Sequence, residues 1–185
     1  MTWLVLGLFL WMAAHLFKRI FPRQRAALGR AGRPVIAALI VTAVVLMVKG
    51  YGEAEVAVLW QLEEWAWHLN NIAMYIAVCL SGLGHAARGW VATHLRHAML
   101  WGAVVWALAH LLVNGDMASL VLFGGLGLWA FAQMAAINRM EGPWPPQDAG
   151  SISKDAVICA AAAFIYAAVV GIHYWLGYQV IAILE

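Results

Sequence analysis

Residues 156–184 read AVICAAAAFIYAAVVGIHYWLGYQVIAIL and contain no charged side chain. The run is longer than the roughly 20 apolar residues that a helix needs to cross the hydrocarbon layer of a bilayer. Further uncharged runs precede it at residues 2–17, 34–48, 65–87, 97–115 and 117–138. They are continuous and lack the alternation of membrane β-barrel strands. The sequence therefore predicts an all-α fold, a polytopic membrane bundle of six transmembrane helices.

The composition excludes several classes of protein. Of the 185 residues, 65% are hydrophobic and 11% are charged, whereas soluble domains are roughly 45–50% apolar and about 25% charged. The uncharged runs leave too little chain for a separate soluble domain. We therefore expect a single transmembrane domain over residues 1–185 and exclude a soluble enzyme and a nucleic-acid binder.

The basic residues predict how the helices are oriented. The first two runs are short, but snorkelling lysines and arginines let them extend to Phe21 and Gly52. Loops rich in Lys and Arg are retained on the cytoplasmic side. Six spans place every basic residue except Lys49 on one side, namely Lys18, Arg19, Arg23, Arg25, Arg30, Arg33, Arg88, Arg96, Arg139 and Lys154. This predicts a membrane protein with both termini on the outer side.

Histidines are the main candidates for chemistry. The chain has seven, and four of them fall in or at the edge of predicted spans: His15, His68, His110 and His173. Ionisable side chains within a bilayer are costly and tend to mark function. Imidazole binds metals and haem iron and carries protons near neutral pH. A hydrogen-bonded packing histidine is the alternative for any single one of them.

Three of these histidines have similar predicted depths near the outer side. Asn71 and Tyr75 follow His68 at i+3 and i+7, and Asn114 follows His110 at i+4, so each group shares a helix face. We expect a polar pocket that opens outward, lined by His68, Asn71, Tyr75, His110, Asn114 and His173. His15 belongs to a deeper layer, because it lies roughly 20 Å from the outer end of its helix at 1.5 Å per residue.

Three stretches carry a resemblance to a known family. They are LRHAMLWG at 95–102, WALAHLLVNGD at 106–116, and Ser119 with FGG at 123–125. They closely resemble the NnrU family of bacterial inner-membrane proteins. The likeness extends over nearly the whole chain and includes His15, Lys49-Gly50-Tyr51 and His173-x-x-Leu-Gly177.

The resemblance implies a link to nitrite and nitric oxide metabolism in denitrification. The family includes the plant zeta-carotene isomerase, a haem b enzyme whose iron ligands match His15 and His110. This implies haem b as cofactor and a small apolar or nitrogen-oxide substrate. The isomerase has a cysteine where this chain has Ala107, and the family's Arg-His-Pro is Arg96-His97-Ala98 here.

Helix geometry gives a different pairing of histidines. At helical rise, His15 and His110 come out roughly 15 Å apart along the membrane normal. From the residues alone, His110 therefore pairs with His68 or His173, and these two remain candidate cofactor-binding residues.

Two other functions fit parts of the sequence. The run Arg96-His97-x-Met99-x-x-Gly102 is similar to an element of membrane methyltransferases that use S-adenosylmethionine. The paired glutamates of those enzymes are missing here, and Glu185 is the only acidic residue after Asp155. A non-catalytic accessory subunit or a transporter is the third interpretation.

Small residues and cysteines give two further expectations. Ala163, Ala167 and Gly171 recur every four residues, which predicts that this face points into the bundle. Cys79 and Cys159 lie inside predicted spans and form no Cys-x-x-Cys-His motif, so a covalent c-type haem is excluded. Their interpretation is as small buried hydrophobes.

Overall fold

The computed structural model describes residues 1–84, 89–145, 147–178 and 180, and within them it contains helices and no strand beyond two isolated bridges. The chain forms two compact units. Unit 1 comprises Met1–Leu59 and Gly115–Pro143, and unit 2 comprises Trp60–Asn114 and Trp144–Glu185. Within the predicted spans and loops, residues 85–88, 146, 179 and 181–184 lie outside the described residues, as does Glu185.

Unit 1 contains the first two predicted spans and the fifth. Its helices are α1 (Thr2–Ile20), α2 (Pro22–Ala27), η1 (Gly29–Ala31), α3 (Gly32–Gly52), α7 (Met117–Ser119), the π-helical turn η2 (Leu120–Gly124) and α8 (Gly125–Glu141). The extensions of the first two spans to Phe21 and Gly52 agree with the ends of α1 and α3. The basic connection between them is largely helical, since α2 and η1 occupy most of it.

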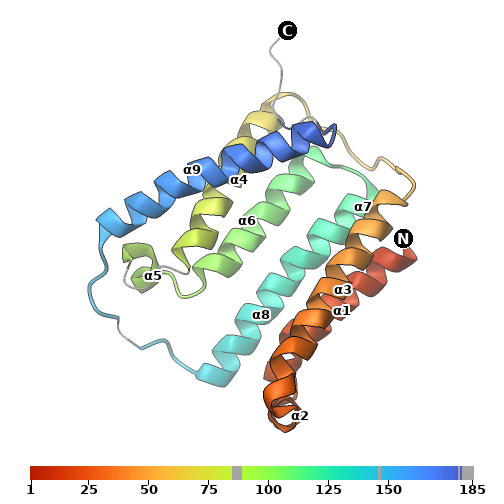
Figure 1. Cartoon of the computed structure of the whole chain (residues 1–185). Coiled ribbons are helices and arrows are strands. Elements are labelled where there is room, and N and C mark those ends of the chain that lie inside the picture. Colours follow the sequence, from red (N-terminus) through yellow and green to blue (C-terminus); the bar gives the residue numbers. More distant parts are fainter. Residues whose placement is uncertain (85–88, 146, 179, 181–185) are drawn as a thin grey trace. The chain divides into compact units, whose positions relative to one another are not determined.

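Helices α1 and α3 lie side by side along their lengths (Figure 1). Glycines allow the close approach. A Cβ on Gly50 would collide with the backbone of Leu4, and one on Gly7 would lie 2.8 Å from the carbonyl oxygen of Ala43. Leu4 is completely buried there. We call this contact the glycine seam.

Contacts at the helix ends fix the directions of the spans in unit 1. Arg19 Nη1 donates to Glu141 Oε1 at 2.7 Å, which joins the last turn of α1 to the last turn of α8. At the opposite end, Tyr51 Oη and Ser119 Oγ lie 2.8 Å apart, which joins the end of α3 to the start of α7. The three spans therefore alternate in direction as the basic residues predict.

Asp116 is the N-cap of the third span of unit 1. Asp116 accepts hydrogen bonds from the backbone N–H of Ser119 at 2.9 Å and from its hydroxyl at 2.6 Å. This satisfies a free N–H of the first helical turn. Ser119 is completely buried, so the Asp116–Ser119–Tyr51 chain supplies the partners that a buried hydroxyl needs.

Unit 2 contains α4 (Trp65–Leu83), α5 (Trp90–His94), α6 (Ala98–Val113) and α9 (Ile152–Trp175). Helix α6 packs closely on α4, because a Cβ on Gly102 would lie 2.9 Å from the carbonyl oxygen of Ala77. The first turn of α9 is tied to α5, since Asp155 Oδ2 accepts the backbone N–H of Val91 at 2.9 Å.

Polar side chains hold α9 against α4. Tyr166 donates to Asn71 Oδ1 at 2.6 Å, and Tyr75 donates to the carbonyl oxygen of Cys159 at 3.0 Å. We call this contact the polar seam. Ala162 is the buried small residue of α9.

The prediction that Ala163, Ala167 and Gly171 face into the bundle is wrong. All three are exposed, because α9 turns Ala162 rather than Ala163 toward α4. Alanine occupies residues 160–163 without a break. Small residues therefore cover several faces at this level, and their spacing does not identify the packed one.

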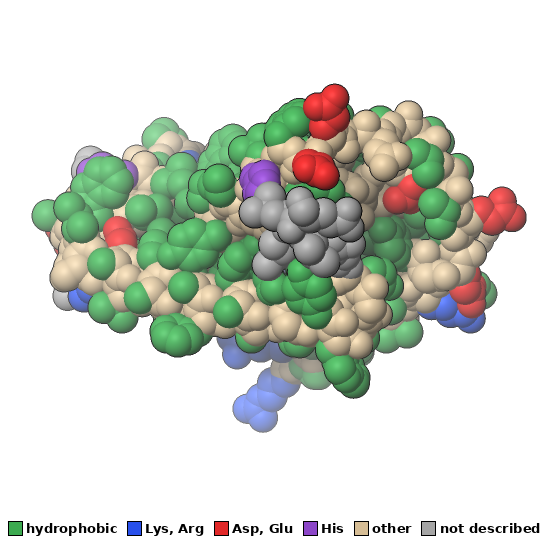
Figure 2. Space-filling model, turned by 90° about the horizontal axis from the view of Figure 1, so that it is seen from above, with side chains coloured by type: hydrophobic (Ala, Val, Ile, Leu, Met, Phe, Trp, Pro, Cys, Tyr) green, Lys and Arg blue, Asp and Glu red, His purple; other side chains and the backbone are tan. Residues whose placement is uncertain are grey.

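Among the described residues, four segments are long and apolar enough to cross a membrane: Thr2–Ile20, Gly29–Gly52, Met117–Glu141 and Ile152–Trp175. Helix α6 is apolar but shorter. Helix α4 is 19 residues long and carries His68, Asn70 and Asn71. Hydrophobic side chains cover much of the surface seen in Figure 2. Phe9, Phe164 and Trp175 are more than 70% exposed, as expected for side chains that face lipid.

Candidate functional site

His15 of α1 lies between two tryptophans of unit 1. The centre of its ring is 4.1 Å from the Trp11 ring and 4.9 Å from the Trp129 ring, and Trp129 meets it edge-on. Nδ1 of His15 lies 2.9 Å from the carbonyl oxygen of Trp11. Because a carbonyl oxygen can only accept, this bond assigns the ring hydrogen to Nδ1 and the lone pair to Nε2.

Unpartnered polar atoms lie on the two tryptophans that contact His15 and on Gln133, one turn after Trp129 in α8. Among the described residues, Trp11 Nε1, Trp129 Nε1 and Gln133 Oε1 are buried without a hydrogen-bond partner. Buried polar groups are normally paired, so each such atom calls for an explanation. Trp11 is four residues before His15, and a shared helix face could have identified it from the sequence. Trp129 and Gln133 come from α8, and no local pattern connects them to His15.

His110 of α6 is anchored in the same way as His15. Its Nδ1 lies 2.9 Å from the carbonyl oxygen of Trp106, one turn earlier, and the two rings are 4.7 Å apart. The carbonyl oxygen of His110 accepts a hydrogen bond from Asn114 Nδ2 at 2.9 Å. His110 and Asn114 share a helix face as expected, and the amide of Asn114 hydrogen-bonds there to the backbone of His110.

His173 of α9 shows the pattern a third time. Its Nδ1 lies 2.8 Å from the carbonyl oxygen of Val169. His110 and His173 both belong to unit 2.

The predicted pocket residues on α4 are placed differently. His68 is exposed. Asn71 and Tyr75 point at α9 and form the polar seam, and Asn71 Nδ2 also donates to the carbonyl oxygen of Trp67. Asn70, which the sequence reasoning did not single out, is 5% exposed, and its Oδ1 has no partner among the described residues.

One tautomer is common to His15, His110 and His173. A hydrogen bond from Nδ1 to a backbone carbonyl orients the ring and leaves Nε2 as the basic nitrogen, which is how proteins prepare histidine to bind a metal. His15 belongs to unit 1 and the other two belong to unit 2. Within the described residues, no three His, Cys, Asp or Glu side chains gather as a metal site.

The sequence of this bundle matches one known protein family. The profile of the NnrU protein family matches residues 3–180. The chain belongs to the NnrU family. No curated protein and no solved structure matches the chain significantly.

The NnrU match spans both units and includes all the candidate histidines. It also covers the motif run at residues 95–102, where the family resemblance and the methyltransferase resemblance compete. His97 precedes the first residue of α6, and Gly102 lies where α6 packs on α4. Helix packing therefore accounts for Gly102 without a bound substrate.

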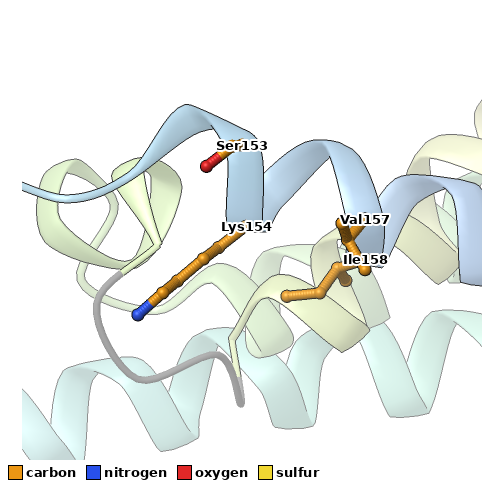
Figure 3. Close-up of a pocket in the computed structure, with 4 residues that line it drawn as sticks. All are labelled: Ser153, Lys154, Val157 and Ile158. Carbon is orange, nitrogen blue, oxygen red and sulfur yellow. The ribbon is translucent and has the colours of Figure 1, made fainter.

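A groove of about 380 Å³ lies at the start of α9 (Figure 3). It is lined by Ser153, Lys154, Val157 and Ile158. His173 is 15 residues further along the helix than Ile158, which is about 22 Å at helical rise. The groove and the anchored histidines are therefore separate features of this NnrU protein.

Proposed function

We propose that this NnrU-family protein crosses the bacterial inner membrane six times with both termini on the periplasmic side. Six spans are supported by the four long apolar helices and by two further helices, the shorter apolar α6 and the 19-residue α4. The bias of basic residues to one side supports the orientation. Single cysteines introduced at Arg30 and Gly52 in a Cys79→Ser/Cys159→Ser background test it. Gly52 should react with an impermeant maleimide in intact spheroplasts, and Arg30 should react only after lysis.

We infer that the protein acts in nitrite or nitric oxide metabolism and binds haem b through His15 and His110. The observation that carries the haem proposal is the repeated tautomer, with Nδ1 held by a backbone carbonyl and Nε2 carrying the lone pair. His173 has the same arrangement. His173 is the second candidate for the residue that binds haem together with His110, and the exposed His68 is the third.

The residues around His15 fit a bound porphyrin. Two indole rings hold its imidazole in place, and the buried Trp129 excludes water from one side. The unpartnered polar atoms of Trp11, Trp129 and Gln133 favour a ligand over a packed core. When bound, haem supplies one-electron chemistry or a coordination position for a small nitrogen oxide or an apolar substrate.

A set of histidine variants tests the ligand assignment. We expect His15→Ala and His110→Ala each to abolish the low-spin haem signal in electron paramagnetic resonance, because each would remove one of the two residues that hold the haem. His94→Ala is the matched control, since His94 also has Nδ1 against a carbonyl but lies exposed on α5. Loss of the signal in His173→Ala, with His15→Ala unaffected, would instead assign the pair to His110 and His173.

Two alternatives are separated by other assays. Transfer of a labelled methyl group from S-adenosylmethionine to a small acceptor would favour the methyltransferase. Normal activity of His15→Ala and His110→Ala cells, with a partner complex lost on deletion of the gene, would favour an accessory subunit or a transporter.

A further inference from the structure

The chain's two cysteines meet at the inner end of the polar seam. Cys79 of α4 is buried, and Cys159 of α9 is half-buried. They pack in one cluster with Tyr75 and Ile158. The only two cysteines of the sequence thus lie in one contact between two helices.

Contacts on both sides of the thiols hold the helices close together. One turn before Cys79, Tyr75 donates to the carbonyl oxygen of Cys159 at 3.0 Å. About one turn after it, a Cβ on Gly82 would lie 2.9 Å from the Ile158 side chain. A disulfide between them needs Cβ atoms about 3.5–4.5 Å apart, and the contacts on both sides keep the two helices close together at this level.

We propose that Cys79 and Cys159 form a reversible dithiol–disulfide couple whose oxidant is a lipid-soluble quinone. In the forward step both S–H bonds break and one S–S bond forms. The two electrons and two protons released reduce the quinone to the quinol. A dithiol reductant reverses the reaction by thiol–disulfide exchange.

The surroundings of the pair indicate the class of oxidant. Both cysteines lie within membrane helices, where a charged oxidant dissolves poorly. The neighbours of Cys159 on α9 are open to lipid, since Val157 is 69% exposed and Ala160 is also exposed. An apolar two-electron acceptor can therefore reach the thiol of Cys159 from the hydrocarbon side.

Tyr75 lies in the same cluster as the two cysteines and can take part in proton transfer. Its hydroxyl donates its single hydrogen to the carbonyl oxygen of Cys159 at 3.0 Å, so its phenolic oxygen is left to accept a hydrogen bond from a thiol. Oxidation would then lock α9, which carries His173, to α4.

The test uses full-length protein in lipid nanodiscs treated with decylubiquinone. After denaturation, remaining thiols are labelled with a polyethylene glycol maleimide, and the intact mass is measured. We expect monomer with no labelled thiol and a mass lower by two hydrogens, and we expect dithiothreitol to restore both labels. Cys79→Ser and Cys159→Ser should each keep their single label.

A matched control moves one thiol by one residue along α9. In Cys159→Ser/Ala160→Cys the new side chain is exposed and turned about 100° away from α4, so both labels should remain after treatment. Retention of both labels by the wild type would overturn the proposal. Disulfides found only between molecules, or formed only with the polar oxidant diamide, would overturn it as well.

Discussion

Helices α1 and α9 are attached to their units in different ways. Helix α1 lies against α3 along the glycine seam, where Gly7 and Gly50 let the two backbones approach. Helix α9 lies against α4 along the polar seam, where two tyrosine hydroxyls reach across. Lipid is as apolar as leucine, so close packing and hydrogen bonds, rather than the hydrophobic effect, must hold membrane helices together.

The difference bears on the histidines that these helices carry. His15 sits on a helix whose position is set by backbone contact and by two tryptophans. His173 sits on a helix that is mostly exposed and is held by a few side-chain hydrogen bonds. We therefore expect the position of His15 to be robust to polar substitutions and that of His173 to depend on them.

The largest effect should come from filling the glycine seam. Gly50→Leu would push its side chain into the backbone of Leu4, which cannot rotate away. The cost therefore lies at or above the top of the roughly 1–3 kcal/mol that is usual for overpacking. We expect little monodisperse protein after detergent extraction. Gly52→Leu is the control on the same helix, since nothing lies within 4 Å of a Cβ there. Equal yields for the two variants would refute the glycine seam.

The next effect should come from Trp129, which fixes His15 from α8. Trp129→Ala removes an indole that is 8% exposed, and such truncations cost about 3–5 kcal/mol in packed cores. Trp175→Ala is the comparison, because its ring is 84% exposed. Apparent melting temperatures in detergent measure both. A larger drop for Trp175→Ala would show that the packing around His15 is wrong.

A smaller effect is expected in the polar seam. A double-mutant cycle of Asn71→Leu and Tyr166→Phe should give a coupling of about 0.6–1.7 kcal/mol, the range for hydrogen bonds between membrane helices. Pairing Asn71→Leu with Tyr174→Phe supplies the control, since Tyr174 is exposed. Zero coupling for Asn71 and Tyr166 would remove that contact from the seam.

The smallest effect should come from the ion pair at the end of α1. The side chains of Arg19 and Glu141 are 19% and 49% exposed, and such exposed pairs contribute about 0–1 kcal/mol. We expect Arg19→Ala to lower the free energy of unfolding by at most that amount, and less in high salt. A loss as large as that of Trp129→Ala would mean that this end of α1, and not the glycine seam, holds the helix.

The apolar runs predicted the helices well because lipid imposes a simple rule on composition and length. The ends of α1 and α3 agree with the snorkelling argument, and Asn71 and Tyr75 share a face as their spacing predicts. The helical turns α2 and α5 were missed, since short helices at an interface need no long apolar run.

The surroundings of the histidines were harder to predict. Trp11 follows from helix periodicity, whereas Trp129 belongs to a helix more than 100 residues away in the chain. The anchoring of Nδ1 on the preceding turn depends on side-chain rotation, which spacing does not encode. The contact between Cys79 and Cys159 depends on the rotation of α9, which its continuous alanine run conceals.

The central claim is that intramembrane histidines present Nε2 to haem iron. An absorption spectrum of full-length protein, purified after expression with an ample haem supply, tests it most directly. We predict a Soret band in the oxidised sample, sharp α and β bands on reduction, and loss of those bands in His15→Ala. A colourless wild-type protein that binds no added haem would contradict the claim.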